Sequence, residues 1–137
     1  MERFSKPLNF QLSLHSLNDA IRFQLIPKTK PVESILAALK RATPHFDEVA
    51  VNYLLMDGVN DSDDDMEALI ESVDPRWVVK LNPLIGDGPY KASSRREEWG
   101  RKLALSGVNA AVFNSVGSKI GNGLYGHLTH AQNNRIA

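Results

Sequence analysis

Hydrophobic and polar residues follow two different periods along this chain and predict alternating strands and helices. Alternating apolar residues over 9–14 predict a first strand. The almost continuous apolar run 49–56 is typical of a strand buried on both faces, as in a parallel sheet. The run 77–82, ended by Pro83, and the run 109–113 predict a third and a fourth strand.

Apolar residues recur at helical spacing between these strands. Those of 32–39 predict a helix that ends near Thr43. Ser62 has the properties of an N-cap, three aspartates follow it, and an apolar stripe over 66–73 completes the pattern of a second helix.

A charged helix is expected before the last strand. Either Ser93 or Ser94 is predicted to cap it, and its apolar residues are Trp99, Leu103 and Leu105. The resulting order, β-α-β-α-β-α-β, predicts an α/β protein with a mainly parallel sheet and right-handed crossovers. Half of a barrel and a small open sheet both fit this order.

No linker or repeat divides the sequence, so residues 1–137 are predicted to form a single domain. Sixteen basic residues balance sixteen acidic ones, which gives no global field for nucleic acid or anionic membrane. The complete lack of cysteine excludes disulfides, thiolate catalysis and cysteine-ligated iron–sulfur clusters within this chain. No apolar run is long enough to span a bilayer and the N-terminus lacks a signal-peptide core, so we expect a cytoplasmic protein that does not enter membranes.

Candidate chemistry lies at the strand ends, where α/β folds bind ligands. His15 follows the first strand and could hydrogen-bond a ligand or transfer a proton; spacing alone favours an imidazole satisfied by a neighbouring loop. Ser13 could donate to a ligand carboxylate or to a local carbonyl. Asn82, extended because Pro83 follows, could read a heterocycle or begin an Asx-turn.

Other polar groups favour structural roles. Asp19 is predicted to lie in the first turn of a helix and to pair with Arg22. The segment 57–61 could bind a hard cation, but its spacing differs from a calcium loop and favours a tight turn and helix cap. His127 and His130 lack neighbouring carboxylates and are poor evidence for a metal site.

Three ordered motif blocks, spanning roughly residues 8–128, resemble one family. Their residues are Ser13-Leu14-His15 with Asn18-Asp19, Arg22 and Leu25-Ile26-Pro27; Tyr53 to Ser62; and Asn82-Pro83 with Gly86 and Pro89-Tyr90, followed by weaker matches at Ile120, Gly126 and Leu128. On these motifs the chain resembles the radical S-adenosylmethionine (SAM) enzymes that methylate adenine C2 in ribosomal and transfer RNA, and their C8-methylating relatives.

The resemblance implies that residues 8–116 form the C-terminal half of a partial TIM-type barrel. Residues 117–137 would then be a family-like C-terminal extension, in a glycine- and asparagine-rich tail expected to be loop or weakly ordered. It also implies SAM as the cofactor. The positions that match SAM contacts of the family are Ser13, Leu14, His15 and Asn82.

The family's cysteine loop for the [4Fe–4S] cluster and its glycine-glutamate strand end have no counterpart here. Tyr125 aligns with the family's methyl-carrying cysteine, and Phe113 and Val116 align with basic residues, which disfavours RNA contact on that face. The resemblance therefore implies a C-terminal enzyme part that contributes SAM-binding residues, does not hold the cluster and is not catalytic alone. We expect its sheet to be completed by a chain carrying the missing half or by a second copy. The alternative is a degenerate, non-catalytic binding or interaction domain, or a truncated remnant.

Overall fold

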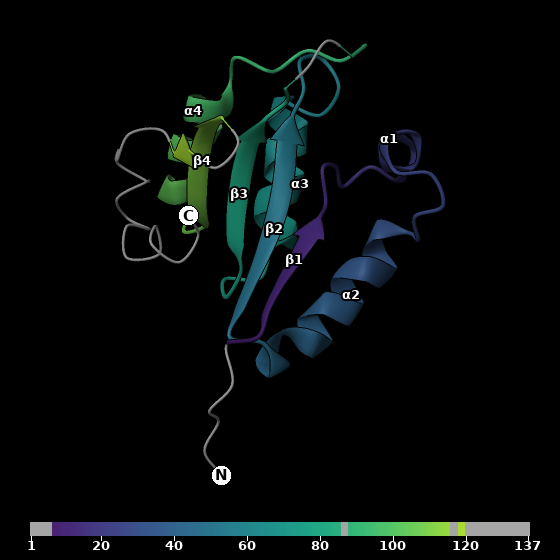
Figure 1. Cartoon of the computed structure of the whole chain (residues 1–137), viewed down its shortest axis with the longest axis vertical. Helices are drawn as coiled ribbons and strands as arrows, with labels where there is room; N and C mark the ends of the chain where they lie inside the picture. Colours follow the sequence, from purple (N-terminus) through teal and green to yellow (C-terminus); the bar gives the residue numbers. More distant parts are fainter. Residues whose placement is uncertain (1–6, 86–87, 116–117, 120–137) are drawn as a thin grey trace.

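Strands and helices alternate through the computed structural model, which describes residues 7–85, 88–115 and 118–119 (Figure 1). The strands are β1 (Asn9–Ser13), β2 (Glu48–Leu55), β3 (Val78–Pro83), β4 (Asn109–Ser115) and β5 (Ser118–Lys119). The helices are α1 (Asp19–Leu25), α2 (Val32–Ala42), α3 (Asp63–Ser72) and α4 (Arg96–Leu105), with a 3₁₀ turn η1 (Thr43–His45) after α2.

The described strands form one sheet in the order β1-β2-β3-β4-β5. The first four pair in parallel, and β5 pairs antiparallel to β4. This arrangement confirms the predicted α/β class, because sequential parallel neighbours need crossover connections, which the helices supply. The predicted strand bounds hold to within about two residues; Pro83 is the last residue of β3 rather than the residue after it.

One face of the sheet packs against helices and carries the hydrophobic core. Figure 1 shows α3 behind β2 and β3, and side chains of both strands belong to the same core cluster as Met66 and Leu69 of α3. Tyr53, Trp77 and Trp99 are its largest fully buried side chains. The N-cap prediction for α3 is confirmed: Ser62 forms a capping box with Asp65.

The opposite face of β1–β3 carries polar side chains. Because successive side chains of a strand point to opposite faces, Gln11, Ser13, Asn52, Lys80 and Asn82 lie on the side away from the core. No described helix covers that face, which points toward the viewer in Figure 1. On this face Gln11 and Ser13 are exposed, Asn52 and Asn82 are half-buried, and Lys80 is buried, so the exposed polar groups lie mainly along β1.

The predicted N-cap of α4 is wrong. Its N-cap is Arg95, not a serine, because the Ser93 hydroxyl accepts the Arg95 N–H (3.0 Å) and donates to Asp61 (2.5 Å). Leu105 is 86% exposed. It follows the buried Leu103 by two residues, or about 200° around the helix, so it faces away from the core.

Candidate functional site: the carboxyl ends of β1 and β3

The segment after β1 crosses the carboxyl end of the sheet in an unusual conformation. His15 has φ +60°, in the left-handed region that non-glycine residues rarely adopt. Its imidazole Nδ1 accepts the backbone N–H of Leu54 at 2.9 Å, so the side chain bridges β1 to the next strand. A sparsely populated backbone conformation held by such a contact is typical of ligand-binding segments.

His15 is a neutral imidazole with one defined tautomer. Burial, assisted by the nearby charge of Arg22, lowers the pKa of His15 to about 4. Because Nδ1 accepts a hydrogen bond, the ring proton lies on Nε2, which is then a donor. Nε2 makes no hydrogen bond to any described residue. The imidazole is therefore held by a strand backbone rather than by the predicted loop, and its Nε2–H has no partner among the described residues.

Arg22 binds two backbone carbonyls of this segment and does not form the predicted ion pair with Asp19. Arg22 is 3% exposed, its Nε donates to the Leu14 carbonyl at 2.9 Å, and its Nη2 donates to the Ser13 carbonyl at 2.8 Å. The carboxylate of Asp19 instead accepts the N–H of Val32 at 2.8 Å. The reason is geometric: α1 places Arg22 next to two carbonyls at the end of β1, of which the Ser13 carbonyl points away from β2 and the Leu14 carbonyl loses Leu54 N–H to His15.

Asn60 is a second residue that holds the site in place through hydrogen bonds. Its position in the sequence did not predict this role. It is fully buried. Its Nδ2 donates to the carbonyls of His15 (2.7 Å) and Leu54 (2.8 Å), while its Oδ1 accepts the N–H of Met56 (2.7 Å). The prediction that 57–61 is a structural turn agrees with these bonds. Within the described residues, no group of three or more His, Cys, Asp and Glu side chains could hold a metal ion.

A row of amides runs across the polar face next to His15. Asn52 Nδ2 donates to Gln11 Oε1 at 2.9 Å, and Asn82 Nδ2 donates to Asn52 Oδ1 at the long distance of 3.5 Å. No described residue donates to the Oδ1 acceptor of Asn82. Lys80 is 6% exposed on the same face; burial lowers its pKa, and Glu48 opposes that shift. This row could have been predicted from the sequence, because Asn52, Lys80 and Asn82 are polar residues at alternate positions within otherwise apolar strands.

The structure brings three of the four predicted site residues to one edge. Ser13 is exposed, and its hydroxyl makes no hydrogen bond to a described residue. Asn82 pairs in register with Leu54, whose N–H holds His15. Leu14 differs: its side chain is fully buried, its N–H donates to Asn52, and its carbonyl accepts from Ser16 and Arg22. Leu14 therefore has no polar group left to offer a ligand.

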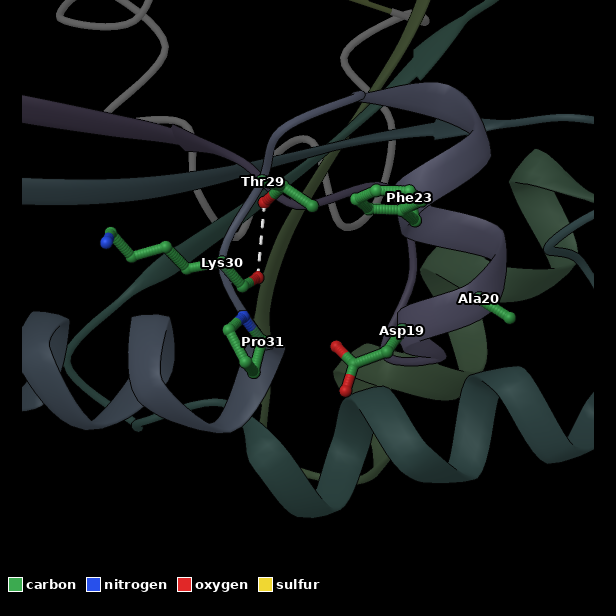
Figure 2. Close-up of a pocket in the computed structure, with 6 residues that line it drawn as sticks. All are labelled: Asp19, Ala20, Phe23, Thr29, Lys30 and Pro31. Atoms are coloured by element: carbon green, nitrogen blue, oxygen red, sulfur yellow. Dashed lines mark hydrogen bonds between the residues drawn. The ribbon is translucent and has the colours of Figure 1, made fainter.

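A separate hollow of about 380 Å³ lies between α1 and the segment that leads to α2 (Figure 2). Its lining residues include Asp19, Phe23 and Lys30 but none of the predicted site residues. It is therefore distinct from the strand-end site. His127, His130 and the predicted extension 117–137, apart from Ser118–Lys119, lie outside the described residues, as do Val116 and Tyr125.

Comparisons with known proteins agree on one family. The chain is 29% identical over 128 residues to a probable dual-specificity RNA methyltransferase RlmN of Caldicellulosiruptor saccharolyticus, covering 88% of this chain and 37% of the relative. It is 32% identical over 120 residues to a probable RNA methyltransferase of Pseudomonas aeruginosa, covering 82% and 35%. No protein-family model matches. The chain thus spans little more than a third of the length of these relatives.

Solved structures give the same result. A radical SAM methyltransferase from Sphaerobacter thermophilus superposes with a TM-score of 0.67 and 31% identity, over 81% of this chain and 34% of that one. A domain of pyruvate-formate lyase-activating enzyme from Bacteroides vulgatus shares the fold, with a TM-score of 0.64 and 18% identity over 77% of this chain and 67% of that one. No helix in the described ranges is long and apolar enough to cross a membrane. Over most of its length, this chain is therefore a relative of the radical SAM RNA methyltransferases and matches the C-terminal part of that family.

Proposed function

We propose that this chain is the C-terminal part of a radical SAM methyltransferase and that it binds SAM at the carboxyl edge of its sheet. The observation that carries the proposal is the fixed Nε2 donor of His15, at the same sheet edge as Ser13 and Asn82. The ligand class comes from the relatives, which are RNA and SAM-dependent methyltransferases.

The donors and acceptors of the site fit the parts of SAM. The Ser13 hydroxyl can donate to the ligand's carboxylate, and the His15 Nε2–H can donate to a ring nitrogen or ribose oxygen. The free Oδ1 of Asn82 can accept from the exocyclic amine of adenine. Leu14 contributes by position: its engaged backbone and buried side chain hold Ser13 and His15 in place.

Bound SAM supplies a transferable methyl group. The chain contains no cysteine, so the thiolates that bind an iron–sulfur cluster would come from another polypeptide or segment. We therefore propose that this chain binds SAM but does not catalyse methylation alone. The substrate of the completed enzyme would be RNA, and the enzyme would act in the cytoplasm. A non-catalytic binding domain is the second candidate, favoured by the same absence of cysteine.

Titration calorimetry with SAM tests the proposal. Ser13→Ala and Asn82→Ala each remove one hydrogen bond worth about 1–1.5 kcal/mol, so each should raise the Kd for SAM about 5- to 10-fold. Asn9→Ala, at the opposite end of β1, is the matched control and should leave the Kd unchanged. Thermal melts of all variants check that they fold.

Two results would contradict the proposal. The first is no heat of binding at millimolar SAM, both for the chain alone and in complex with a cysteine-bearing segment of a relative. The second is binding that neither substitution weakens, which would place the ligand elsewhere. Methyl transfer to RNA by the complex, but not by the chain alone, would decide for the enzyme part over the non-catalytic domain.

A further inference from the structure

The outer edge of β1 is an unused hydrogen-bonding edge. In a parallel strand, the N–H and C=O of one residue point to the same side, and the side alternates along the chain. Leu14 donates to Asn52 of β2 at 3.0 Å, so alternate residues, Asn9, Gln11 and Ser13, point away from β2. Only the Ser13 carbonyl among these groups has a partner within the described residues, and that partner is Arg22.

An apolar groove follows the same edge. It has a volume of about 320 Å³ and lies between β1 and α2. Its lining is Phe10, Leu12, Lys30, Ser34, Ile35, Ala38, Leu39, Ala42 and Phe46. Figure 1 shows α2 beyond β1, on the side opposite β2. The apolar face of α2 thus extends past the last strand of the sheet.

The edge also lacks the features that protect edge strands from pairing. The sequence of β1, NFQLS, contains no charge and no proline; Phe10 within it is 38% exposed and Leu8 just before it is 53% exposed. Parallel sheets are ordinarily covered, because their crossover helices pack on the strands they connect. Here α2 lies beyond β1, the last strand on that side of the described sheet (Figure 1).

We propose that this edge and groove bind a parallel β-strand from a polypeptide equivalent to the part of the relatives that this chain does not cover. The relatives contain roughly twice as much further polypeptide, because the matched segment is 37% of one and 35% of another. A second copy related by a two-fold axis would present its β1 antiparallel instead. The inference rests on the family assignment behind the proposed function, but not on SAM binding.

The free groups define the register of the added strand. The N–H groups of Asn9, Gln11 and Ser13 and the carbonyls of Asn9 and Gln11 are available, whereas Arg22 occupies the Ser13 carbonyl. Pairing therefore ends at Ser13. A parallel strand of about the length of β1 would bring its own carboxyl end beside Ser13 and His15, so it would add residues to the ligand site.

The test mixes this chain with the segment of the Caldicellulosiruptor saccharolyticus relative that lies outside the matched 128 residues. A one-to-one complex is expected by light scattering. Hydrogen exchange of the Asn9, Gln11 and Ser13 amides should slow at least 10-fold in the complex, since those amides become hydrogen-bonded. The adjacent amides of Phe10 and Leu12, already bonded to β2, should change little.

Substitutions on α2 give a matched pair. Ala38→Glu puts a carboxylate into the groove and should weaken the complex at least 30-fold, whereas Ala37→Glu, exposed one position away and not in the groove lining, should not. No complex, equal effects of the two substitutions, or unchanged exchange of the three outward amides would overturn the proposal. So would a dimer of this chain alone that Ala38→Glu dissociates, because the occupant would then be a second copy. Failure of SAM binding with an intact complex would reject the proposed function and leave this interface standing.

Discussion

Replacing Asn60 by alanine should weaken the whole domain and release His15. The Asn60 side chain joins the loop after β1 to the end of β2, because it donates to His15, 45 residues before it, and to Leu54. Alanine removes all three side-chain hydrogen bonds without adding bulk. Two carbonyls and one N–H then lose their partners.

The magnitude follows from how deeply each group is buried. Met56 is 3% exposed, so its N–H stays unsatisfied and costs about 2 kcal/mol, within the range for a buried unpaired group. The carbonyls of His15 and Leu54 belong to half-buried residues, where water can compensate in part, and each costs about 0.5–1 kcal/mol. The expected loss in the free energy of unfolding is about 3–4 kcal/mol, a large fraction of the 5–15 kcal/mol typical of a domain.

Urea unfolding monitored by tryptophan fluorescence measures this loss. The midpoint should fall while the slope stays constant, since the surface exposed on unfolding is the same. Asn9→Ala, an exposed asparagine whose side chain makes no hydrogen bond to a described residue, should change the midpoint little. A loss below about 1 kcal/mol for Asn60→Ala would refute the reasoning, because water would then satisfy groups that the structure buries.

Three further predictions concern single groups. The pKa of His15 is about 4 in the folded protein and about 6.5 in the unfolded chain, so the unfolded chain binds the proton more tightly. The free energy of unfolding should therefore fall by up to about 3 kcal/mol as the pH drops from about 6.5 to 4. An imidazole that titrates near 6.5 by NMR would disprove this. Thr43→Val removes the acceptor of the buried Trp77 indole N–H (2.8 Å) and should lower the free energy of unfolding by about 1–3 kcal/mol, whereas Thr43→Ser should retain the hydrogen bond and cost less. Gly107→Ala, at φ +90°, should cost about 1 kcal/mol in the same assay, and a stabilised variant would show that the turn tolerates a side chain.

Local patterns were sufficient for most of the fold. The β2 strand and the N-cap at Ser62 could be predicted because hydrophobic periodicity and helix capping each depend on only a few neighbouring residues. The wrong N-cap of α4 occurred where a local rule met a competing contact. Ser93 is a good N-cap type, yet Asp61, 32 residues away, takes its hydroxyl. Leu105 follows the apolar spacing only loosely, and the helix turns it to solvent.

The sequence by itself determined the α/β class, the mainly parallel sheet and the placement of Ser13, His15 and Asn82 at strand ends, because these follow from periodicity and chain direction. Only the tertiary structure decided which groups remain free. Leu54 fixes the His15 tautomer, Arg22 and Asn60 fix the loop, and Leu14 is fully engaged. Whether a polar group is engaged or free depends on hydrogen-bond partners that are distant in the chain, and residue spacing does not predict such partners.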